Sequence, residues 1–249
     1  MHILIANDDG YLAPGIRALA RVLGQHHQIT VCAPEQNASG TSNALTLHRP
    51  LQVWQDDLGH HVLNGTPADC VHVALTGLCG SRPDVVVSGI NNGANLGEDT
   101  LYSGTVGAAM EGYLFGVPAL AFSQVERGWH GLDAAADLAL HWVTQLSGRI
   151  ASVKVGQERP FLLNVNLPAG ATVSTPTEWV RLGRRHASSG VIRQVSPRGD
   201  DLYWIGPAGA AADASEGTDF GAIARGHVSV TPLQIDLTDH GALAQREPG

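Results

Sequence analysis

Short apolar runs alternate with segments of helical period along the first two thirds of the chain. Apolar and β-branched runs predict strands at residues 2–6, 28–33, 84–90, 118–125 and 161–167. Apolar residues at a helical spacing predict helices at residues 16–23, 66–80, 105–115 and 132–146. Strands that alternate with helices are typical of α/β proteins, in which helical crossovers join the strands of a parallel sheet. We therefore expect an α/β core with a mainly parallel sheet.

Local signals refine this prediction at three places. Thr66, Pro67 and Asp69 supply a capping residue, a proline at the first helical position and an acid three residues after the cap, so a helix should begin there. The run 84–90 is the most hydrophobic of the predicted strands, which indicates burial on both faces of the sheet. Residues 45–55 and 61–63 are interpreted as extra strands.

The pattern changes after Pro168. Glycine, proline and arginine become frequent, and short strand-like pieces lie at residues 191–195, 202–205 and 227–230. A hairpin alone is marginally stable in water, so this part should pack against the core or against a second subunit. We expect residues 1–168 to form the α/β core, with the extra strands at about 45–63, and residues 169–249 to form a hairpin-rich appendage with a C-terminal strand that serves oligomerisation. The Ala/Gly-rich stretch 206–214 is expected to be a mobile loop.

Composition limits the class of protein. The 249 residues are 43% hydrophobic and 15% charged, a balance that can close a sizeable core and excludes a disordered chain. The formal net charge of -8 predicts that the protein as a whole repels nucleic acid polymers and anionic membranes. A phosphate-bearing ligand would therefore need a local site of positive potential.

Cysteine use and the N-terminus predict the compartment. Cys32, Cys70 and Cys79 cannot all pair with one another, and each lies among apolar neighbours where a reduced thiol behaves as a small hydrophobe. No apolar run reaches the roughly 18–20 residues that span a bilayer. Residues 1–4 lack a basic segment ahead of a signal core. We expect a cytoplasmic protein without a membrane partner.

Candidate chemistry lies where the predicted strands end. Asp8 and Asp9 follow the first strand, Ser39 follows the second, and Asn91 follows the buried strand 84–90. The carboxyl ends of parallel strands meet at one edge of a sheet, so these side chains should come together. Two adjacent carboxylates repel each other, and a divalent cation is the simplest compensation. An all-oxygen ligand set favours Mg²⁺, Mn²⁺ or Ca²⁺, although an Asp pair after a strand can also merely cap the next helix.

A second feature follows closely in the sequence. Tyr102, Ser103, Gly104 and Thr105 enter a helix of small residues, and the free N–H groups of a helix start form an anion site. Taken alone, such a start is an ordinary helix cap. Beside a cation site, however, it predicts a cradle for phosphate. The predicted phosphate-binding residues are Asn91, Asn95, Ser103, Gly104 and Thr105.

Several of these segments carry a family resemblance. The run 3–10 (ILIANDDG), the runs 39–43 (SGTSN) and 65–70 (GTPADC), and the long run 87–112 resemble the survival protein E (SurE) family of 5'-nucleotidases. The resemblance extends over nearly the whole chain, to the segment 226–232. One departure lies in the loop before Ser39, where relatives often have a basic residue and this chain has Glu35-Gln36-Asn37-Ala38.

The resemblance implies a Rossmann-like, three-layer core and metal-dependent hydrolysis of phosphomonoesters, chiefly nucleoside 5'-monophosphates. Hydrolysis of 3'-monophosphates and of short polyphosphate falls within the same expectation. It implies metal ligands at Asp8, Asp9, Ser39 and Asn91, one divalent cation per subunit (Mg²⁺ or Mn²⁺), and a homodimer or homotetramer built partly by exchanged C-terminal elements. We expect Asp8 or Asp9 to take the proton of the attacking water or to assist the leaving group.

Other interpretations fit the sequence less well. A haloacid-dehalogenase-type phosphatase needs a second Asp two positions after the first, where this chain has Gly10. A zinc deacetylase expects a histidine before the Asp pair, where Asn7 stands. The alternative from a different class is a nucleotide-binding regulatory module without turnover. The basic cluster Arg181, Arg184, Arg185 and His186 is interpreted either as a contact to nucleotide phosphate across a subunit boundary or as a solvated face.

Overall fold

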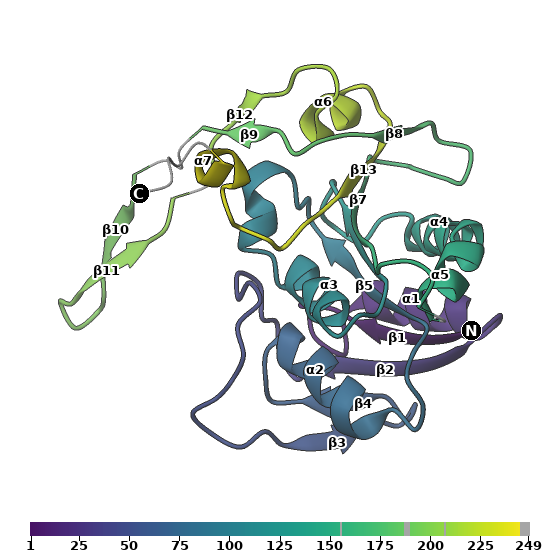
Figure 1. Ribbon diagram of the computed structural model, residues 1–249. Coiled ribbons are helices and arrows are strands. Elements are labelled where there is room, and N and C mark those ends of the chain that lie inside the picture. Colours follow the sequence, from purple (N-terminus) through teal and green to yellow (C-terminus); the bar gives the residue numbers. More distant parts are fainter. Residues whose placement is uncertain (155, 187–189, 207, 245–249) are drawn as a thin grey trace.

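The computed structural model describes residues 1–154, 156–186, 190–206 and 208–244. Nine strands form one central sheet in the order β3-β4-β2-β1-β5-β6-β7-β13-β8 (Figure 1). The bounds of these strands are β1 His2–Ala6, β2 Gln28–Pro34, β3 Val53–Gln55, β4 His61–Leu63, β5 Val85–Asn92, β6 Ala119–Gln124, β7 Leu162–Leu167, β8 Thr177–Trp179 and β13 Val228–Pro232. The central strands β2, β1, β5, β6 and β7 all run parallel, which confirms the predicted α/β class and mainly parallel sheet.

Helices cover both faces of the sheet, as a parallel sheet buried on both sides requires. Along β1, Ile3 and Ile5 pack into the core under α1 and α4, whereas Leu4 packs into the core under α2 and α3. The three layers are visible in Figure 1, with α2 and α3 on one side and α1, α4 and α5 on the other. The helix bounds are α1 Pro14–Gly24, α2 Pro67–Val73, α3 Gly104–Leu114, α4 Leu132–Gln145, α5 Ser147–Lys154, α6 Asp219–Ala224 and α7 His240–Ala244.

The start of α2 follows the predicted capping pattern. The Asp69 N–H donates to Thr66 Oγ1 (3.0 Å), and the Thr66 N–H donates to Asp69 Oδ2 (2.8 Å), with Pro67 at the first helical position. These reciprocal bonds satisfy backbone donors that a helix start otherwise leaves unpaired. The helix passes into a π-helical turn over Ala74–Leu78, so the predicted end near residue 80 is also close to the structure.

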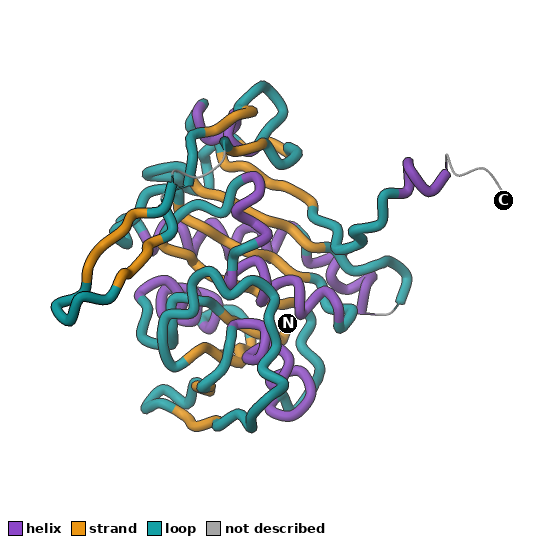
Figure 2. The backbone as a smooth tube through the Cα atoms, turned by 90° about the vertical axis from the view of Figure 1, so that its left-hand side faces the viewer, coloured by secondary structure: helices purple, strands orange, loops and turns teal. Residues whose placement is uncertain are grey.

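Residues beyond 168 add two strands to the central sheet. β13 lies antiparallel to β7, and β8 lies parallel to β13 at the sheet edge. The remaining strands form two small ribbons, β9 (Arg184–Arg185) with β12 (Ala211–Asp213) and β10 (Ile192–Val195) with β11 (Asp201–Trp204). The β10-β11 hairpin extends away from the body of the molecule in Figure 1, and α7 stands apart from the sheet in Figure 2. The division at residue 168 and the oligomerisation role stay predictions.

Two local predictions differ from the structure. The expected strand 45–55 is a strand only over β3, because the preceding residues bond to α2 instead, as in the Thr46 N–H that donates to Asp69 Oδ1 (2.8 Å). The stretch 206–214, expected to be a loop, contains β12, which pairs with β9. Both differences arise because a short strand depends on the partner that it finds in the folded chain.

Candidate functional site

The loop after β1 is folded against the loop after β2. Asn7 Nδ2 donates to the Gly10 carbonyl (2.9 Å), and the Tyr11 N–H donates to the Pro34 carbonyl (2.9 Å). Gly10 has φ +97°, a conformation that favours glycine, and a Cβ there would lie 3.3 Å from the Gln36 carbonyl carbon. The contacts between these loops fix where Asp8 and Asp9 lie at the carboxyl edge of the sheet.

Asp8 is the buried member of the carboxylate pair, with 3% of its surface exposed. Thr105 Oγ1 donates to Asp8 Oδ1 (2.5 Å), and the Ala38 N–H donates to the Asp8 carbonyl (2.7 Å). A Cβ at Gly104 would come within 2.8 Å of Asp8 Cβ, so only glycine allows this approach. Asp8 therefore joins the loops after β1 and β2 to the start of α3.

Burial and hydrogen bonds act in opposite directions on Asp8. Burial raises the pKa of the carboxyl group above its ordinary value, and the Thr105 hydroxyl partly offsets this. The backbone amides of Thr105 and Gly104 also lower its pKa, so the N-terminus of α3 acts on this carboxylate. The turn predicted to bind phosphate thus already interacts with one of the two aspartates.

Asp9 is half-buried and lies beside the end of β5. The Asn92 N–H donates to Asp9 Oδ2 (3.2 Å), and Asn37 Nδ2 donates to Asp9 Oδ1 (3.4 Å). Burial, followed by repulsion from the Asp8 carboxylate, raises the pKa of Asp9 to about 6. A nearby cation would relieve that repulsion, so the electrostatics of the pair fit a positively charged ligand.

Ser39 and Asn91 lie in the segments that contact this pair. The Ser39 N–H donates to Asn37 Oδ1 (3.0 Å), in the loop whose Asn37 contacts Asp9. Asn91 Nδ2 donates to the Gly93 carbonyl (2.9 Å), and Asn91 directly precedes the residue that bonds to Asp9. The loops after β1 and β2 therefore meet the last residues of β5, and the role of Ser39 and Asn91 as metal ligands stays a prediction.

The start of α3 has an ordinary serine cap. Ser103 Oγ accepts a hydrogen bond from the Val106 N–H (3.1 Å), which satisfies one of the free amides of the first turn. The Thr105 hydroxyl is directed to Asp8. The side chains of Ser103 and Thr105 are thus engaged within the protein. Phosphate would contact this turn through its backbone N–H groups, of which those of Gly104 and Thr105 also act on Asp8.

Asn95 occupies a different environment from the aspartate pair. It is 6% exposed, and its Nδ2 donates to Ser123 Oγ on β6 (2.7 Å). Its N–H donates to Asn166 Oδ1 (2.8 Å), and its carbonyl accepts from Asn164 Nδ2 (2.8 Å), both on β7. These contacts anchor the segment between Asn91 and α3 to the sheet. Its assignment as a phosphate contact stays a prediction.

The residues present fit a hard cation better than a soft one. Within the described part of the chain, no group of three or more His, Cys, Asp or Glu side chains is placed to hold a metal. The site instead offers two carboxylates next to hydroxyl and amide groups. Carboxylate, hydroxyl and carbonyl oxygens suit Mg²⁺ or Mn²⁺, whereas zinc sites usually contain histidine or cysteine.

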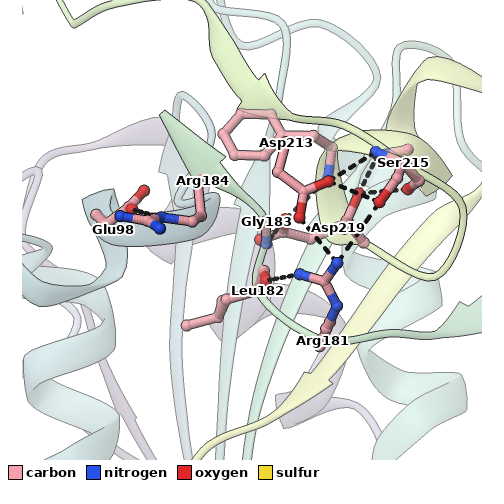
Figure 3. Close-up of polar contacts among 11 residues, drawn as sticks. Glu98, Arg181, Leu182, Gly183, Arg184, Asp213, Ser215 and Asp219 are labelled. Carbon is pink, nitrogen blue, oxygen red and sulfur yellow. Dashed lines mark hydrogen bonds and ion pairs between the residues drawn. The ribbon is translucent and has the colours of Figure 1, made fainter. Parts of the chain in front are cut away.

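The basic cluster near residue 181 is paired within the chain. Arg181 Nη2 donates to Asp213 Oδ2 (2.8 Å), Arg184 Nε contacts Glu98 Oε1 (3.4 Å), and Arg185 Nε donates to Asp99 Oδ2 (2.6 Å). Figure 3 shows the contacts of Arg181 and Arg184. These intrachain pairs favour neither of the two interpretations made from the sequence.

Some residues of the site have no signal in the sequence. Asn37 and Asn92 contact Asp9, yet Asn37, in the loop after β2, and Asn92, at the end of β5, each stand among other polar residues. The bond from Thr105 to Asp8 joins residues 97 positions apart. The frequent asparagines in these segments were the one sequence signal for amide groups next to the carboxylates. The partner of each amide depends on how the loops pack.

Comparisons with known proteins agree with the fold and point to one family. A family model described as "Survival protein SurE" matches residues 3–189. The protein named 5'-nucleotidase SurE from Polaromonas naphthalenivorans is 58% identical over 249 residues, which covers 98% of this chain and 95% of that protein. The protein of the same name from Albidiferax ferrireducens is 58% identical over 245 residues, with the same coverage. A crystal structure of the SurE protein from Aquifex aeolicus, 38% identical, has a TM-score of 0.80 and covers 98% of this chain and 97% of that chain.

Proposed function

This chain belongs to the SurE family, and we propose that it is a 5'-nucleotidase that hydrolyses nucleoside 5'-monophosphates to nucleoside and phosphate. The observation that carries the proposal is that relatives 58% identical over nearly the full chain have this activity in their names. The contact of Asp8 with the N-terminus of α3 supports it, because carboxylates and an anion-binding helix start lie at one point. Hydrolysis of 3'-monophosphates and short polyphosphate is part of the proposal.

We propose that Asp8, Asp9, Ser39 and Asn91 hold one divalent cation, Mg²⁺ or Mn²⁺, in each subunit. When bound, such a cation would neutralise charge on the phosphate oxygens and favour attack by water. The mutual repulsion of Asp8 and Asp9 supports this assignment. Phosphoryl transfer spreads negative charge over the transferred group, so fixed positive potential at this point lowers the barrier.

The chain's own residues have separate roles in the proposed reaction. Backbone N–H groups of the Ser103–Thr105 turn orient the phosphate, and the Thr105 hydroxyl holds Asp8 in place. The water oxygen forms a bond to phosphorus while the bond from phosphorus to the 5' oxygen breaks. Asp9 is less buried than Asp8, so we assign to Asp9 the proton of the water, which is then passed to the leaving 5' oxygen.

A direct assay tests this function. Phosphate release from each nucleoside 5'- and 3'-monophosphate should occur with Mg²⁺ or Mn²⁺ and should stop when a chelator removes the cation. Asp8→Asn and Asp9→Asn should each abolish turnover and keep the fold, which circular dichroism and thermal melting would verify. Full phosphatase activity in both variants would contradict the site. Nucleotide binding without phosphate release would instead favour a regulatory module.

We further propose a cytoplasmic homodimer or homotetramer. None of the described helices is long and apolar enough to cross a membrane. The three cysteines are free thiols, which fits a reducing compartment. The β10-β11 hairpin exposes apolar side chains, among them Ile192, Tyr203 and Trp204. A patch of this kind on a projecting hairpin fits a second copy of the chain.

A further inference from the structure

The segment from Asn91 to Thr105 joins two parts of the proposed site, on which this inference rests. Asn91 stands at its start and the Ser103–Thr105 turn at its end. Its middle is a 3₁₀ turn, η2, over Gly97–Leu101. We call residues 91–105 the phosphate segment. Where η2 lies determines where the Ser103–Thr105 turn lies, because the Ser103 N–H donates to the Asp99 carbonyl (3.1 Å).

A buried carboxylate from the C-terminal part of the chain holds η2. Asp219, at the start of α6, has 0% of its surface exposed. Its Oδ2 accepts a hydrogen bond from the Gly97 N–H (2.8 Å), and its Oδ1 accepts from the Gly183 N–H (2.7 Å) and from the Phe220 N–H (2.8 Å). Figure 3 shows Asp219 beside Gly183. Hydrogen bonds to an ionised acceptor are strong, so this carboxylate ties the phosphate segment to residues beyond 168.

Arg185 makes a second attachment to the same turn. Its N–H donates to Glu98 Oε2 (2.8 Å), and its Nε donates to Asp99 Oδ2 (2.6 Å). Its guanidinium group lies over the Phe220 ring, 4.9 Å from the ring centre. Arg185 thus connects β9, α6 and η2. The Asp99 side chain pairs with Arg185, and the Asp99 carbonyl accepts the hydrogen bond from the Ser103 N–H. Asp99 thus connects Arg185 directly to the Ser103–Thr105 turn.

The packing around Gly97 makes this attachment close. A Cβ at Gly97 would lie 2.8 Å from Phe220 Cε2 and 3.1 Å from the Gly183 carbonyl oxygen. Gly97 also has φ +54°, which favours glycine. The Gly97 backbone therefore packs directly against the Phe220 ring and against Gly183, the residue before β9, and no side chain separates them. A shift of the Asp219 side chain would therefore move Gly97, the first residue of η2.

We propose that Asp219 and Arg185 are positioning residues for phosphate binding, which act through η2 on the Ser103–Thr105 turn. The core side of the phosphate segment is anchored by Asn95 on β6 and β7, and the outer side is anchored by Asp219 and Arg185. Asp219 and Arg185 then act on the proposed site through η2 and do not themselves touch the phosphate. Displacement of binding groups by about 1 Å can cost a hundredfold in rate.

A matched pair of variants tests the proposal in the full chain. Asp219→Asn keeps the shape of the side chain but turns one oxygen acceptor into an NH₂ donor that faces backbone N–H groups. Asp213→Asn is the control, because Asp213 lies in the same part of the chain and bonds to Arg181 and Ser215 but not to η2 (Figure 3). A third variant, Asp99→Asn, removes only the ion pair with Arg185.

The measurements are the dissociation constant of inorganic phosphate by calorimetry, KM and kcat for a nucleoside 5'-monophosphate, and the melting temperature. We expect Asp219→Asn to weaken phosphate binding by about tenfold and to raise KM alongside, because a buried N–H of η2 or its neighbours loses its acceptor and η2 is displaced. For Asp213→Asn, the phosphate dissociation constant and KM should stay within about twofold of the wild-type values, the usual range for a change away from the site. If Asp219 has a purely structural role, Asp219→Asn should lower the melting temperature. Its phosphate affinity, measured well below the melting temperature, should then equal that of the wild type.

The outcomes separate this proposal from the proposed function. If the wild type binds phosphate but releases none from nucleotides, the nucleotidase assignment fails, and the phosphate dissociation constants still decide the positioning role. If Asp219→Asn melts cooperatively and binds phosphate like the wild type, the positioning role is wrong. If Asp219→Asn does not fold, Asp99→Asn decides: weaker phosphate binding supports the proposal, and unchanged binding overturns it.

Discussion

The Asp8 carboxyl group is constrained more closely than its place after a strand requires. The Thr105 hydroxyl, the first amides of α3 and the absence of a side chain at Gly104 all act on it. A buried acid held by a helix start is ionised more readily than burial alone would allow. Thr105 therefore has two roles. It belongs to the turn that is proposed to bind phosphate, and its hydroxyl holds Asp8, which is proposed to bind the cation.

Replacement of the Thr105 hydroxyl tests this role. Thr105→Val keeps the shape of the side chain, and we expect kcat/KM to fall by about 10- to 100-fold because a carboxylate loses a preorganised donor. Thr105→Ser, which keeps the hydroxyl, is the control and should retain most of the activity. Phosphate release gives the rates, and thermal melting checks the fold. Equal activity of the valine and serine variants would show that the hydroxyl has no such function.

At this scale, the sequence predicted the identity of charged residues better than their partners. The sequence places Asp8 and the 103–105 turn in one site, and the hydrogen bond from Thr105 to Asp8 joins them. Asn95 was grouped with them, yet its side chain bonds to Ser123 on β6. Adjacent asparagines in one loop look alike in sequence, and only the direction of the backbone decides which face each side chain takes.

Elements with local signals were predicted well. The helix at Thr66 has its full capping box, and β5 is buried on both faces along most of its length, as its apolar run indicated. Some short strands were predicted as well, among them β4 and the strands of the β10-β11 hairpin, but β12 was not. β12 has only three residues and exists because β9 pairs with it. Its stability comes from contacts distant in sequence, which no local pattern encodes.

An ion-pair cluster joins β8, at the edge of the sheet, to the turn between α6 and β13. Glu178 on β8 accepts hydrogen bonds from Arg225 Nη2 (2.7 Å) and from His227 Nδ1 (2.5 Å). The Arg225 and His227 side chains together hold the pKa of Glu178 at about 2. Because this pKa is lower than in an unfolded chain, the ionised carboxylate favours the folded state above about pH 4.5, and that contribution is lost as the pH falls toward 2.

Glu178→Gln should therefore lower the melting temperature at pH 7. The difference from the wild type should narrow as the pH is reduced from about 4.5 toward 2, because the wild-type carboxyl group then becomes neutral as well. Thermal melts across this pH range provide the measurement. Glu126→Gln, a change at an exposed carboxylate, serves as the control. A pH-independent difference between Glu178→Gln and wild type would rule out the charge as the cause.

At the scale of the whole molecule, the projecting β10-β11 hairpin exposes large apolar side chains. Ile192 on β10 and Trp204 on β11 are 52% and 60% exposed, and they pair directly across the ribbon. Large apolar side chains on an isolated ribbon are costly in water unless another surface covers them. A second copy of the chain is the proposed cover.

Light scattering coupled to gel filtration tests that assembly. The wild type should elute as a dimer or tetramer, and Ile192→Glu combined with Trp204→Glu should shift it toward monomer. Val173→Glu, at an apolar residue of similar exposure outside the hairpin, should leave the assembly unchanged. A monomeric wild type, or a double variant that assembles normally, would contradict the proposal.

The sequence by itself determined the alternation of strands and helices, the carboxylate pair after the first strand and the helix start at Ser103, because each depends on neighbouring residues. Tertiary structure alone decided which groups meet: Thr105 with Asp8, Asn92 with Asp9, and Asp219 with Gly97. These contacts join residues 97, 83 and 122 positions apart. Contacts of such range form only when the sheet order and the packing of the loops are in place, since both set distances that no local spacing contains.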